Sequence, residues 1–260
     1  MSTANPVLTE LNQGVLKITL NRPRANAFDF AMIEAAQKAF VNAERDTQVR
    51  CVLLTGSGSV FSAGQDVKVF QEVEAGSIRY HLQRTYNPLI LQIRRLAKPV
   101  LAAINGPVAG AALGIALACD LRIAADDARF VVGFLGIGLS LDSAVSLFLP
   151  ALIGLGRAAE FTFTNQPITA EQALAWGLVN RVVPAAELPE RASGWATELA
   201  QGPVHAMGLA KRAFNKAVYP NLELVLDYEA HLQEIAGRGE EHKEGVSAFL
   251  EKRAPRFTVM

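Results

Sequence analysis

The chain has 260 residues, of which 50% are hydrophobic and 19% are charged, and this composition excludes a disordered or fibrous protein. Its 25 lysines and arginines equal its 25 aspartates and glutamates in number, so the formal net charge is zero. A general nucleic-acid binder needs a basic excess to neutralise phosphates, so no nucleic-acid partner is expected. The N-terminal residues carry no basic flank before an apolar run. We therefore expect no secretory signal and a cytoplasmic protein.

Strands and helices are predicted to alternate in the first half of the chain. Val15–Leu20 alternates in polarity and is rich in β-branched residues, which favours a strand. Asp29 is placed to cap a helix that runs to about Arg45. The nearly continuous apolar run 49–55 predicts a strand with both of its faces covered. The next expected elements are a helix over 78–96, a strand over 100–104, a helix over 108–119 and a strand over 121–124.

One apolar stretch, residues 100–119, has the composition of a membrane span. Asn105-Gly106-Pro107 interrupts it, however, and a spanning helix needs about 20 continuous apolar residues. We therefore expect a buried strand followed by a short buried helix, and no membrane association.

Helical patterns dominate the second half of the chain. Helices are predicted over 144–149, 157–162, 170–176, 188–200, 204–218, 222–237 and 240–252. Alternating strands and helices followed by helices alone indicate an α/β fold, with a core over residues 1–200 and a helical region over 201–260. Pro203 follows Gln201-Gly202 at this boundary.

Two segments of small residues, 61–66 and 105–112, are candidates for binding through the backbone. The second leads into a predicted helix, whose first N–H groups have no partner within the helix. Two such groups aimed at one point would form an oxyanion hole for a developing enolate. Ordinary turn geometry and close packing explain such glycines equally well at this stage.

These segments also carry a family resemblance. SAGQD (62–66) and KPVLAAINGPVAGAALGIALACDLRIA (98–124) resemble the paired signature of the crotonase, or enoyl-CoA hydratase/isomerase, superfamily. The similarity extends from NRPRANAF (21–28) to EGVSAFLEKRAPRF (244–257). It implies a crotonase fold, a spiral of ββα units with a C-terminal helical trimerisation region. It also implies an acyl-CoA substrate and a homotrimer or dimer of trimers. Coenzyme A would be part of the substrate, and no separate cofactor is implied.

The resemblance assigns site residues one by one. The backbone N–H groups of Gln65 and Ala111 would hold the thioester oxygen. Arg22, Arg24 and Lys68 are candidates for phosphate contacts, although solvated surface side chains would look the same in sequence. The other residues implied in binding substrate or its CoA are Ala25, Ala63, Asp66, Tyr86, Gly110 and Phe134, with Lys252 and Phe257 directed at a neighbouring subunit. No metal site is expected, because the four histidines show no ligand spacing.

The acid–base residues indicate the reaction. A typical hydratase of the superfamily has two glutamates, and their positions hold Gly114 and Phe134 here. Asp142 is the acid that remains, and isomerase branches keep one Asp at this position. Within the superfamily the segments YNPL (86–89) and RFVVGF (129–134) are most similar to the ring-1,2-epoxyphenylacetyl-CoA isomerase branch. From the residues alone, an N-cap of the following helix is the simpler interpretation of Asp142.

The expected function is therefore an acyl-CoA isomerase. It would shift a double bond or rearrange a ring epoxide through an enolate, with Asp142 as the proton-transfer residue. An apolar surround of Phe134, Leu139 and Leu141 is expected to raise the pKa of Asp142. The alternatives are an enoyl-CoA hydratase, which is a lyase, and a non-catalytic relative that binds CoA thioesters.

Overall fold

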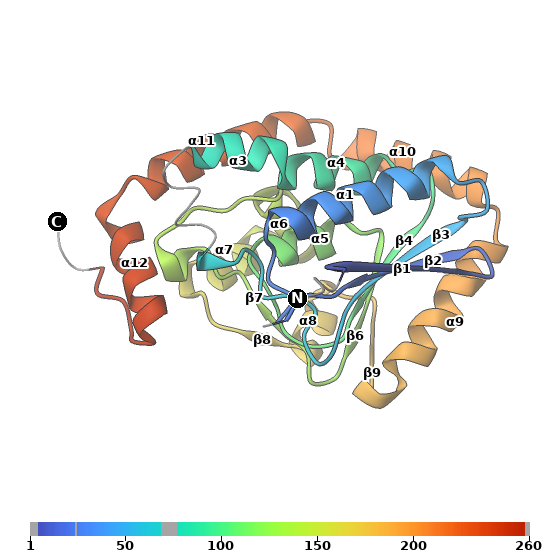
Figure 1. Ribbon diagram of the computed structural model, residues 1–260, viewed down its shortest axis with the longest axis horizontal. Helices are drawn as coiled ribbons and strands as arrows, with labels where there is room; N and C mark the ends of the chain where they lie inside the picture. Colours follow the sequence, from blue (N-terminus) through green and yellow to red (C-terminus); the bar gives the residue numbers. More distant parts are fainter. Residues whose placement is uncertain (1–4, 24, 69–76, 258–260) are drawn as a thin grey trace.

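A six-stranded sheet forms the centre of the computed structural model, which describes residues 5–23, 25–68 and 77–257 (Figure 1). Its spatial order is β1-β2-β3-β4-β6-β9. The first pair is antiparallel, and the other neighbours are parallel. Parallel strands need crossover connections, so this sheet confirms the α/β class. The strands are β1 (Val7–Asn12), β2 (Val15–Leu20), β3 (Cys51–Gly56), β4 (Val100–Ile104), β6 (Leu121–Ala125) and β9 (Arg181–Val183).

A second, smaller sheet gives the chain its spiral course, because the chain alternates between the two sheets. It contains β5 (Val108–Ala109), β7 (Arg129–Val131) and β8 (Ile168–Thr169). The chain passes from β4 in the large sheet to β5 in the small one, and from β6 to β7 in the same way. The segment after β3 joins the small sheet through a parallel bridge between Ser62 and Val108. This alternation confirms the expected spiral of strand–strand–helix units.

Helices surround the two sheets, and several begin where the sequence predicts. Asp29 caps the first of them by accepting a hydrogen bond from the Met32 N–H at 2.8 Å. Thr169 and Gln172 form a capping box at another. The helices of the described residues are α1 (Phe30–Arg45), α3 (Ile78–Arg84), α4 (Tyr86–Arg95), α5 (Ala111–Ala118), α6 (Val145–Ile153), α7 (Leu155–Thr164), α8 (Ala170–Trp176), α9 (Leu188–Gln201), α10 (Val204–Val218), α11 (Leu222–Gly237) and α12 (Glu240–Glu251), with the 3₁₀ turns η1 (Leu135–Ile137) and η2 (Ala185–Glu187).

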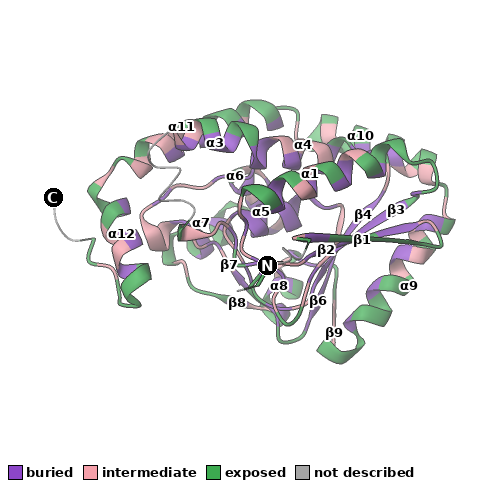
Figure 2. Ribbon diagram, viewed as in Figure 1, coloured by how far each residue is buried: buried purple, intermediate pink, exposed green. Residues whose placement is uncertain are grey.

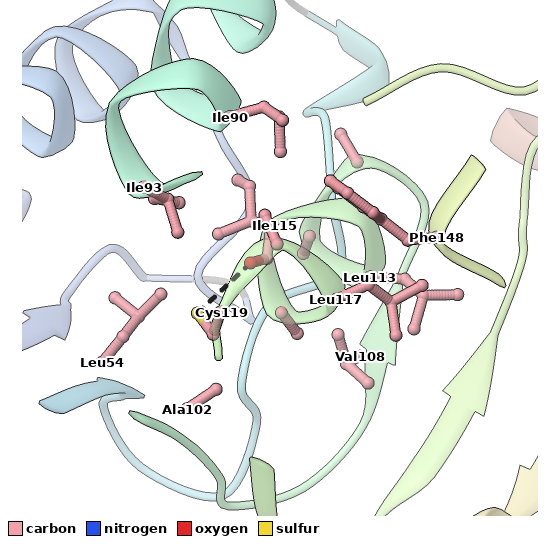
Figure 3. Close-up of a cluster of buried hydrophobic side chains, with 14 of the residues drawn as sticks. Leu54, Ile90, Ile93, Ala102, Val108, Leu113, Ile115, Leu117, Cys119 and Phe148 are labelled. Atoms are coloured by element: carbon pink, nitrogen blue, oxygen red, sulfur yellow. Dashed lines mark hydrogen bonds between the residues drawn. The ribbon is translucent and has the colours of Figure 1, made fainter. Parts of the chain in front are cut away.

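Both faces of the large sheet are covered, as the apolar strands predict. Successive side chains of a strand point to opposite faces. Val52 and Leu54 of β3 therefore join the main core beneath α1, α4 and α5, which Figure 3 shows around Cys119. Cys51 and Leu53 pack against α9 in a second core. In Figure 2 the inner strands β3, β4 and β6 and the inner sides of the helices are largely buried, while β1 and the outer sides of the helices are exposed.

Two predicted helices differ from the structure. The helix expected over 78–96 is broken at Thr85, whose φ of −115° and ψ of −84° are not helical, and α3 and α4 lie on either side. The helix expected over 108–119 begins at Ala111, because the first two residues pair with β7 instead. The strands β1, β5, β7, β8 and β9 were not expected. The last four have only two or three residues, which carry little periodic signal, whereas β1 has six and was overlooked.

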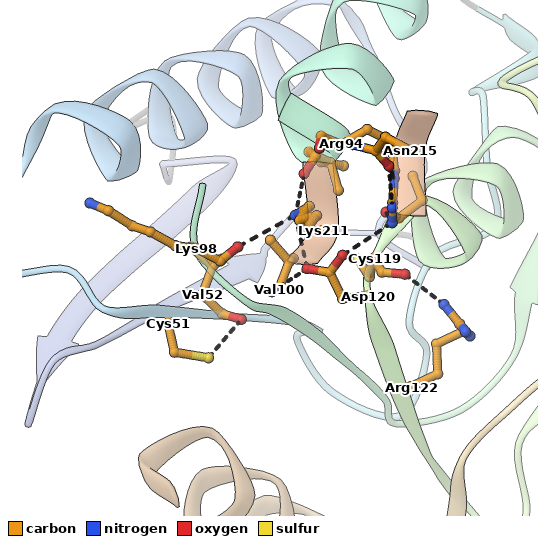
Figure 4. Close-up of polar contacts among 12 residues, drawn as sticks. Cys51, Val52, Arg94, Lys98, Val100, Cys119, Asp120, Arg122, Lys211 and Asn215 are labelled. Atoms are coloured by element: carbon orange, nitrogen blue, oxygen red, sulfur yellow. Dashed lines mark hydrogen bonds and ion pairs between the residues drawn. The ribbon is translucent and has the colours of Figure 1, made fainter. Parts of the chain in front are cut away.

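A buried ion-pair network attaches the C-terminal helices to the core (Figure 4). Lys211 of α10 donates from Nζ to Asp120 Oδ2 at 2.8 Å, and Arg94 of α4 donates from Nη1 to Asp120 Oδ1 at 3.1 Å. Further along, α11 packs on α3 and α12 on η1. The division at residue 200 stays a prediction. None of the helices within the described ranges is both long and apolar enough to cross a membrane.

Candidate active site

Two backbone turns lie side by side at the start of α5. The Ala109 N–H donates to the Ser62 carbonyl oxygen at 3.1 Å, within the parallel pairing of Ser62 with Val108. Three residues further along each strand stand Gln65 and Ala111. The structure therefore brings together the two residues that the resemblance assigns to the oxyanion hole.

The N–H groups of these two residues are available to a ligand. In the described part of the chain, neither the Gln65 N–H nor the Ala111 N–H donates a hydrogen bond. Gly64 allows the two turns to approach, because a Cβ there would lie 2.7 Å from the Ala109 carbonyl oxygen and 3.5 Å from the Ala111 nitrogen. Its φ of +83° also favours glycine. The arrangement can place two converging donors on one carbonyl oxygen.

Asn26 and Ser62 hold this turn in place, and sequence reasoning missed both. Asn26 is 3% exposed and donates from Nδ2 to the carbonyl oxygens of Ser57 and Val60 at 2.9 and 2.8 Å. Ser62 donates from Oγ to the Asn26 carbonyl oxygen at 2.7 Å and accepts from the Gly64 N–H at 3.1 Å. The φ of Asn26 is +51°, a conformation that asparagine tolerates better than most residues. The available signals were an Asn shortly after the Asn21-Arg22-Pro23 break and a Ser within the small-residue segment 61–66.

The side chain of Gln65 is held by residues of α3 and α4. Tyr86 donates its phenolic hydroxyl to Gln65 Oε1 at 2.6 Å, and His81 Nε2 lies 3.4 Å from the same oxygen. Burial lowers the pKa of His81 to about 4, so its imidazole is neutral at pH 7. Burial, followed by the negative charge of Asp142, raises the pKa of Tyr86 well above its usual value. Tyr86 therefore holds the Gln65 side chain as a neutral phenol.

Asp142 is a buried acid with two hydrogen-bond donors. It is 7% exposed, and it accepts from Ser143 Oγ at 2.7 Å and from Gln233 Nε2 at 2.8 Å. Burial raises its pKa to about 6, and the two hydrogen bonds partly offset that rise. The N-cap interpretation of Asp142 is wrong. Helix α6 begins at Val145, and the Asp142 side chain makes no capping hydrogen bond to it. A carboxylate with this pKa is suited to proton transfer near neutral pH.

Glu229 of α11 is a second buried acid, which sequence reasoning missed. It is 3% exposed and accepts from the N–H groups of Ala144 and Ser146 at 2.7 and 3.0 Å, and from Ser146 Oγ at 2.5 Å. It thereby caps α6 from another helix. Burial first, and also the charge of Asp142, raises the pKa of Glu229 to about 7. A charged residue on the apolar face of α11 was the signal in the sequence.

Gly114 of α5 packs directly against the residue after Asp142. A Cβ at this position would lie 2.5 Å from both the Cβ and the carbonyl oxygen of Ser143. Close contacts of this kind exclude any side chain unless the backbone moves. The position at which the resemblance places a hydratase glutamate is therefore already filled.

The candidates for CoA contacts lie in different surroundings. The guanidinium of Arg22 pairs with Asp29 at 2.8 Å and with Asp66 at 2.9 Å, so both carboxylates already compensate its charge. Ala25 accepts from the Ala63 N–H at 3.0 Å, which places both small residues beside the oxyanion turn. Their roles in binding stay predictions.

The remaining predicted residues are spread over the molecule. Phe134 is 6% exposed and belongs to the main core. Lys68 is exposed, and so are Lys252 and Phe257 at the end of α12. Arg24 lies outside the described residues. Within those residues, histidines, cysteines, aspartates and glutamates form no cluster of three or more that would hold a metal ion.

The chain is similar to known proteins over nearly its whole length. It is 40% identical over 256 residues to 1,2-epoxyphenylacetyl-CoA isomerase of Escherichia coli (strain K12), with 97% of this chain and 98% of that protein covered. It is 35% identical over 240 residues to 4-chlorobenzoyl coenzyme A dehalogenase-2 of an Arthrobacter species, with 91% and 87% covered.

Solved structures and a family profile agree with these relatives. The crystal structure of an enoyl-CoA hydratase from Mycobacterium avium subsp. paratuberculosis K-10 matches with a TM-score of 0.88 at 32% identity, covering 98% of this chain and 99% of that one. The profile of the family described as Enoyl-CoA hydratase/isomerase matches residues 10–259. The chain therefore belongs to the enoyl-CoA hydratase/isomerase family.

Proposed function

We propose that the protein is an acyl-CoA isomerase in which Asp142 transfers the proton. The Asp142 carboxylate takes a proton from a carbon of the acyl group. The electrons left behind delocalise onto the thioester oxygen and form an enolate. The N–H groups of Gln65 and Ala111 hold the enolate oxygen. The carboxylic acid then returns the proton to another carbon, so substrate and product have the same atoms. No resident cofactor takes part.

Two observations carry this proposal: Asp142 is a buried acid, and Gly114 is in tight contact with the adjoining Ser143. Asp142 has a pKa of about 6, which suits a group that must both accept and return a proton. Hydration would need a second carboxylate on the same water, and the contact of Gly114 with Ser143 leaves no room for one at that position. One carboxylate is sufficient for isomerisation.

The acyl group is proposed to be a 3-enoyl chain or the ring epoxide of phenylacetyl-CoA. The relative at 40% identity is named for the epoxide reaction. Lys68 is exposed and, as far as the structure describes the chain, forms no ion pair, so it is the favoured cation for a CoA phosphate.

The test is the conversion of a 3-enoyl-CoA to the conjugated 2-enoyl-CoA, followed by ultraviolet absorbance. Asp142→Asn should lower kcat about 10²- to 10⁴-fold and leave the affinity for a saturated acyl-CoA unchanged. Asp127→Asn changes an exposed carboxylate in the same way and is the matched control. The epoxide substrate is assayed in parallel by chromatography. Formation of a 3-hydroxyacyl-CoA by the wild type, or full activity of Asp142→Asn on both substrates, would contradict the proposal.

We also propose that the chain assembles as a homotrimer or a dimer of trimers. The C-terminal helices expose large apolar side chains, which isolated soluble chains seldom gather on one region. They are Leu209, Phe214, Val218, Leu224, Tyr228, Ile235, Phe249 and Leu250.

A further inference from the structure

Two carboxylates, those of Asp142 and Glu229, are buried close together without a compensating cation. They are 7% and 3% exposed, and neither forms an ion pair within the described ranges. Burial raises the pKa of Glu229, and the negative charge of Asp142 adds to that rise. Burying a charge costs free energy unless it is paired, and such arrangements cluster at functional sites. A purely structural core would be better served by apolar side chains here.

Glu229 stabilises the strained turn on which Asp142 stands. Ser143 and Ala144 are fully buried and have φ values of +56° and +60°, a backbone region that side chains disfavour. The Glu229 carboxylate accepts from the N–H groups of Ala144 and Ser146, on the far side of that turn. On the near side, Ser143 Oγ donates to Asp142. The orientation of the Asp142 carboxylate therefore depends on a residue of a different helix.

Gln233 lies one helical turn after Glu229, on the same buried face of α11. It is 1% exposed and donates from Nε2 to Asp142 Oδ2, while its Oε1 is buried without a hydrogen-bond partner. A carboxamide has a donor and an acceptor. If the Gln233 carboxamide turned through 180°, its Oε1 would accept a hydrogen bond from protonated Asp142. Its NH₂ group would then occupy the buried position where Oε1 now has no hydrogen-bond partner. One hydrogen bond is exchanged for another, so Gln233 can match both states of the acid.

We propose that Glu229 and Gln233 of α11 are positioning residues for the proton transfer. Gln233 orients the Asp142 carboxyl group in both of its protonation states, and Glu229 fixes the turn that carries it and places a second titratable carboxyl group beside it. The inference deepens the proposed function and rests on the assignment of Asp142.

Substitutions at the two positions should move the titration of Asp142 in opposite directions. The titratable groups that face Asp142 are Tyr86 from α4 and Glu229 from α11, and the phenol stays neutral because its pKa is raised. Gln233→Leu removes a donor to the carboxylate, so the pKa of Asp142 should rise by about one unit. Glu229 ionises just above Asp142, so the two titrations overlap in the wild type. Glu229→Gln removes that second ionisation, so Asp142 should titrate in a single step with its midpoint at slightly lower pH than in the wild type.

The experiment combines carboxyl NMR titration of the full chain with the pH profile of isomerisation. In Gln233→Leu, kcat should fall about 10- to 100-fold with KM nearly unchanged, and the acidic limb should move to higher pH. In Glu229→Gln the limb should move to lower pH. Gln48→Leu and Glu223→Gln, at exposed positions, are the matched controls and should change neither quantity. Circular dichroism confirms that each variant is folded.

The outcomes separate this inference from the proposed function. An unchanged Asp142 titration in both folded variants overturns the inference, whether or not the wild type isomerises the substrates tested. A loss of activity with no shift of the acidic limb would mean that α11 only packs, and it also overturns the inference. If the wild type shows no isomerisation but the two variants shift the NMR titration in opposite directions, the inference stands and the proposed reaction fails. If only one of the two variants folds, the inference stands or falls on whether the Asp142 titration of that variant shifts in the direction predicted for it.

Discussion

At the scale of single residues, Asp142 couples stability to pH. Its pKa is about 6 in the folded chain and near 3.8 when unfolded, so the folded state binds the proton more tightly. The contribution of this residue is therefore fully favourable below pH 3.8 and is lost as pH rises through 6. We expect the Asp142→Asn variant to gain stability relative to the wild type by about 1–2 kcal/mol between pH 5 and pH 8.

Urea unfolding at the two pH values measures that difference. Asp127→Asn is again the control, because an exposed carboxylate should give no such dependence. A constant gap between Asp142→Asn and the wild type would show that the carboxylate is not destabilised in the fold. A larger difference in the free energy of unfolding at high pH would mean that the buried Asp142 carboxylate lowers the stability of the fold.

Gly114 provides a second prediction at this scale. Gly114→Ala forces a Cβ into Ser143, and overpacking of this kind costs about 1–3 kcal/mol. The same change at Gly194 of α9 meets open space and should instead stabilise by about 0.5–1 kcal/mol. Thermal unfolding compares the two, and isomerisation by Gly114→Ala should fall because Ser143 adjoins the acid. Equal stability of the two variants would contradict the tight contact.

At the scale of elements, Asp120 joins three parts of the fold. It accepts from Lys211 of α10, from Arg94 of α4 and from the N–H of Val100 in β4. Lys211 and Arg94 are 6% and 7% exposed (Figure 4). Asp120→Ala leaves both cations buried without this partner and should cost about 3–5 kcal/mol.

A double variant checks this explanation. Asp120→Ala combined with Lys211→Met removes one of the stranded cations, so it should lose less stability than Asp120→Ala alone. Denaturant unfolding gives both values. Additive losses would show that the two side chains do not act as a pair.

Local signals predicted elements well, and long-range contacts decided the exceptions. The cap at Asp29 and the helix 170–176 depend on residues three positions apart, so the sequence determines them locally. The break at Thr85 had a local signal that was overlooked: Pro88, in the first turn of α4, cannot continue a helix from α3 because it lacks an N–H and clashes with the preceding turn. Helix α3 also packs on α11, far along the chain. The cap of α6 was assigned to Asp142 because the actual capping carboxylate is distant in sequence: Glu229 is 83 residues away from Ser146.

At the scale of the whole molecule, the apolar faces of the C-terminal helices predict an oligomer. Light scattering should give a mass three or six times 27.9 kDa. Phe214 and Leu224 are 64% and 72% exposed, and replacing both with Glu should yield monomers, because a buried charge at an interface is costly. Glu substituted at Phe163, exposed on α7, is the comparison. A monomeric wild type at micromolar concentration would contradict the prediction.

The candidate site was predictable where the backbone forms it and much less so where side chains meet. The SAGQD and NGPVAGAA segments indicated the turns of Gln65 and Ala111, and pairing in the small sheet places them together. Gln233 and Glu229 gave no motif. Their significance depends on which face of α11 is buried and on what lies opposite, and neither follows from spacing along the chain.

The order in which the parts of the site can form during synthesis follows from the position of α11 after both oxyanion turns in the chain. A ribosome releases Gln65 and Ala111 more than one hundred residues before Glu229 and Gln233. The N–H pair belongs to turns that the early part of the spiral can form, whereas the setting of Asp142 must wait for the last helices. Under the proposed function, a nascent chain would therefore form the N–H pair before α11 can set the Asp142 carboxyl group, and isomerisation would have to wait until α11 has left the ribosome.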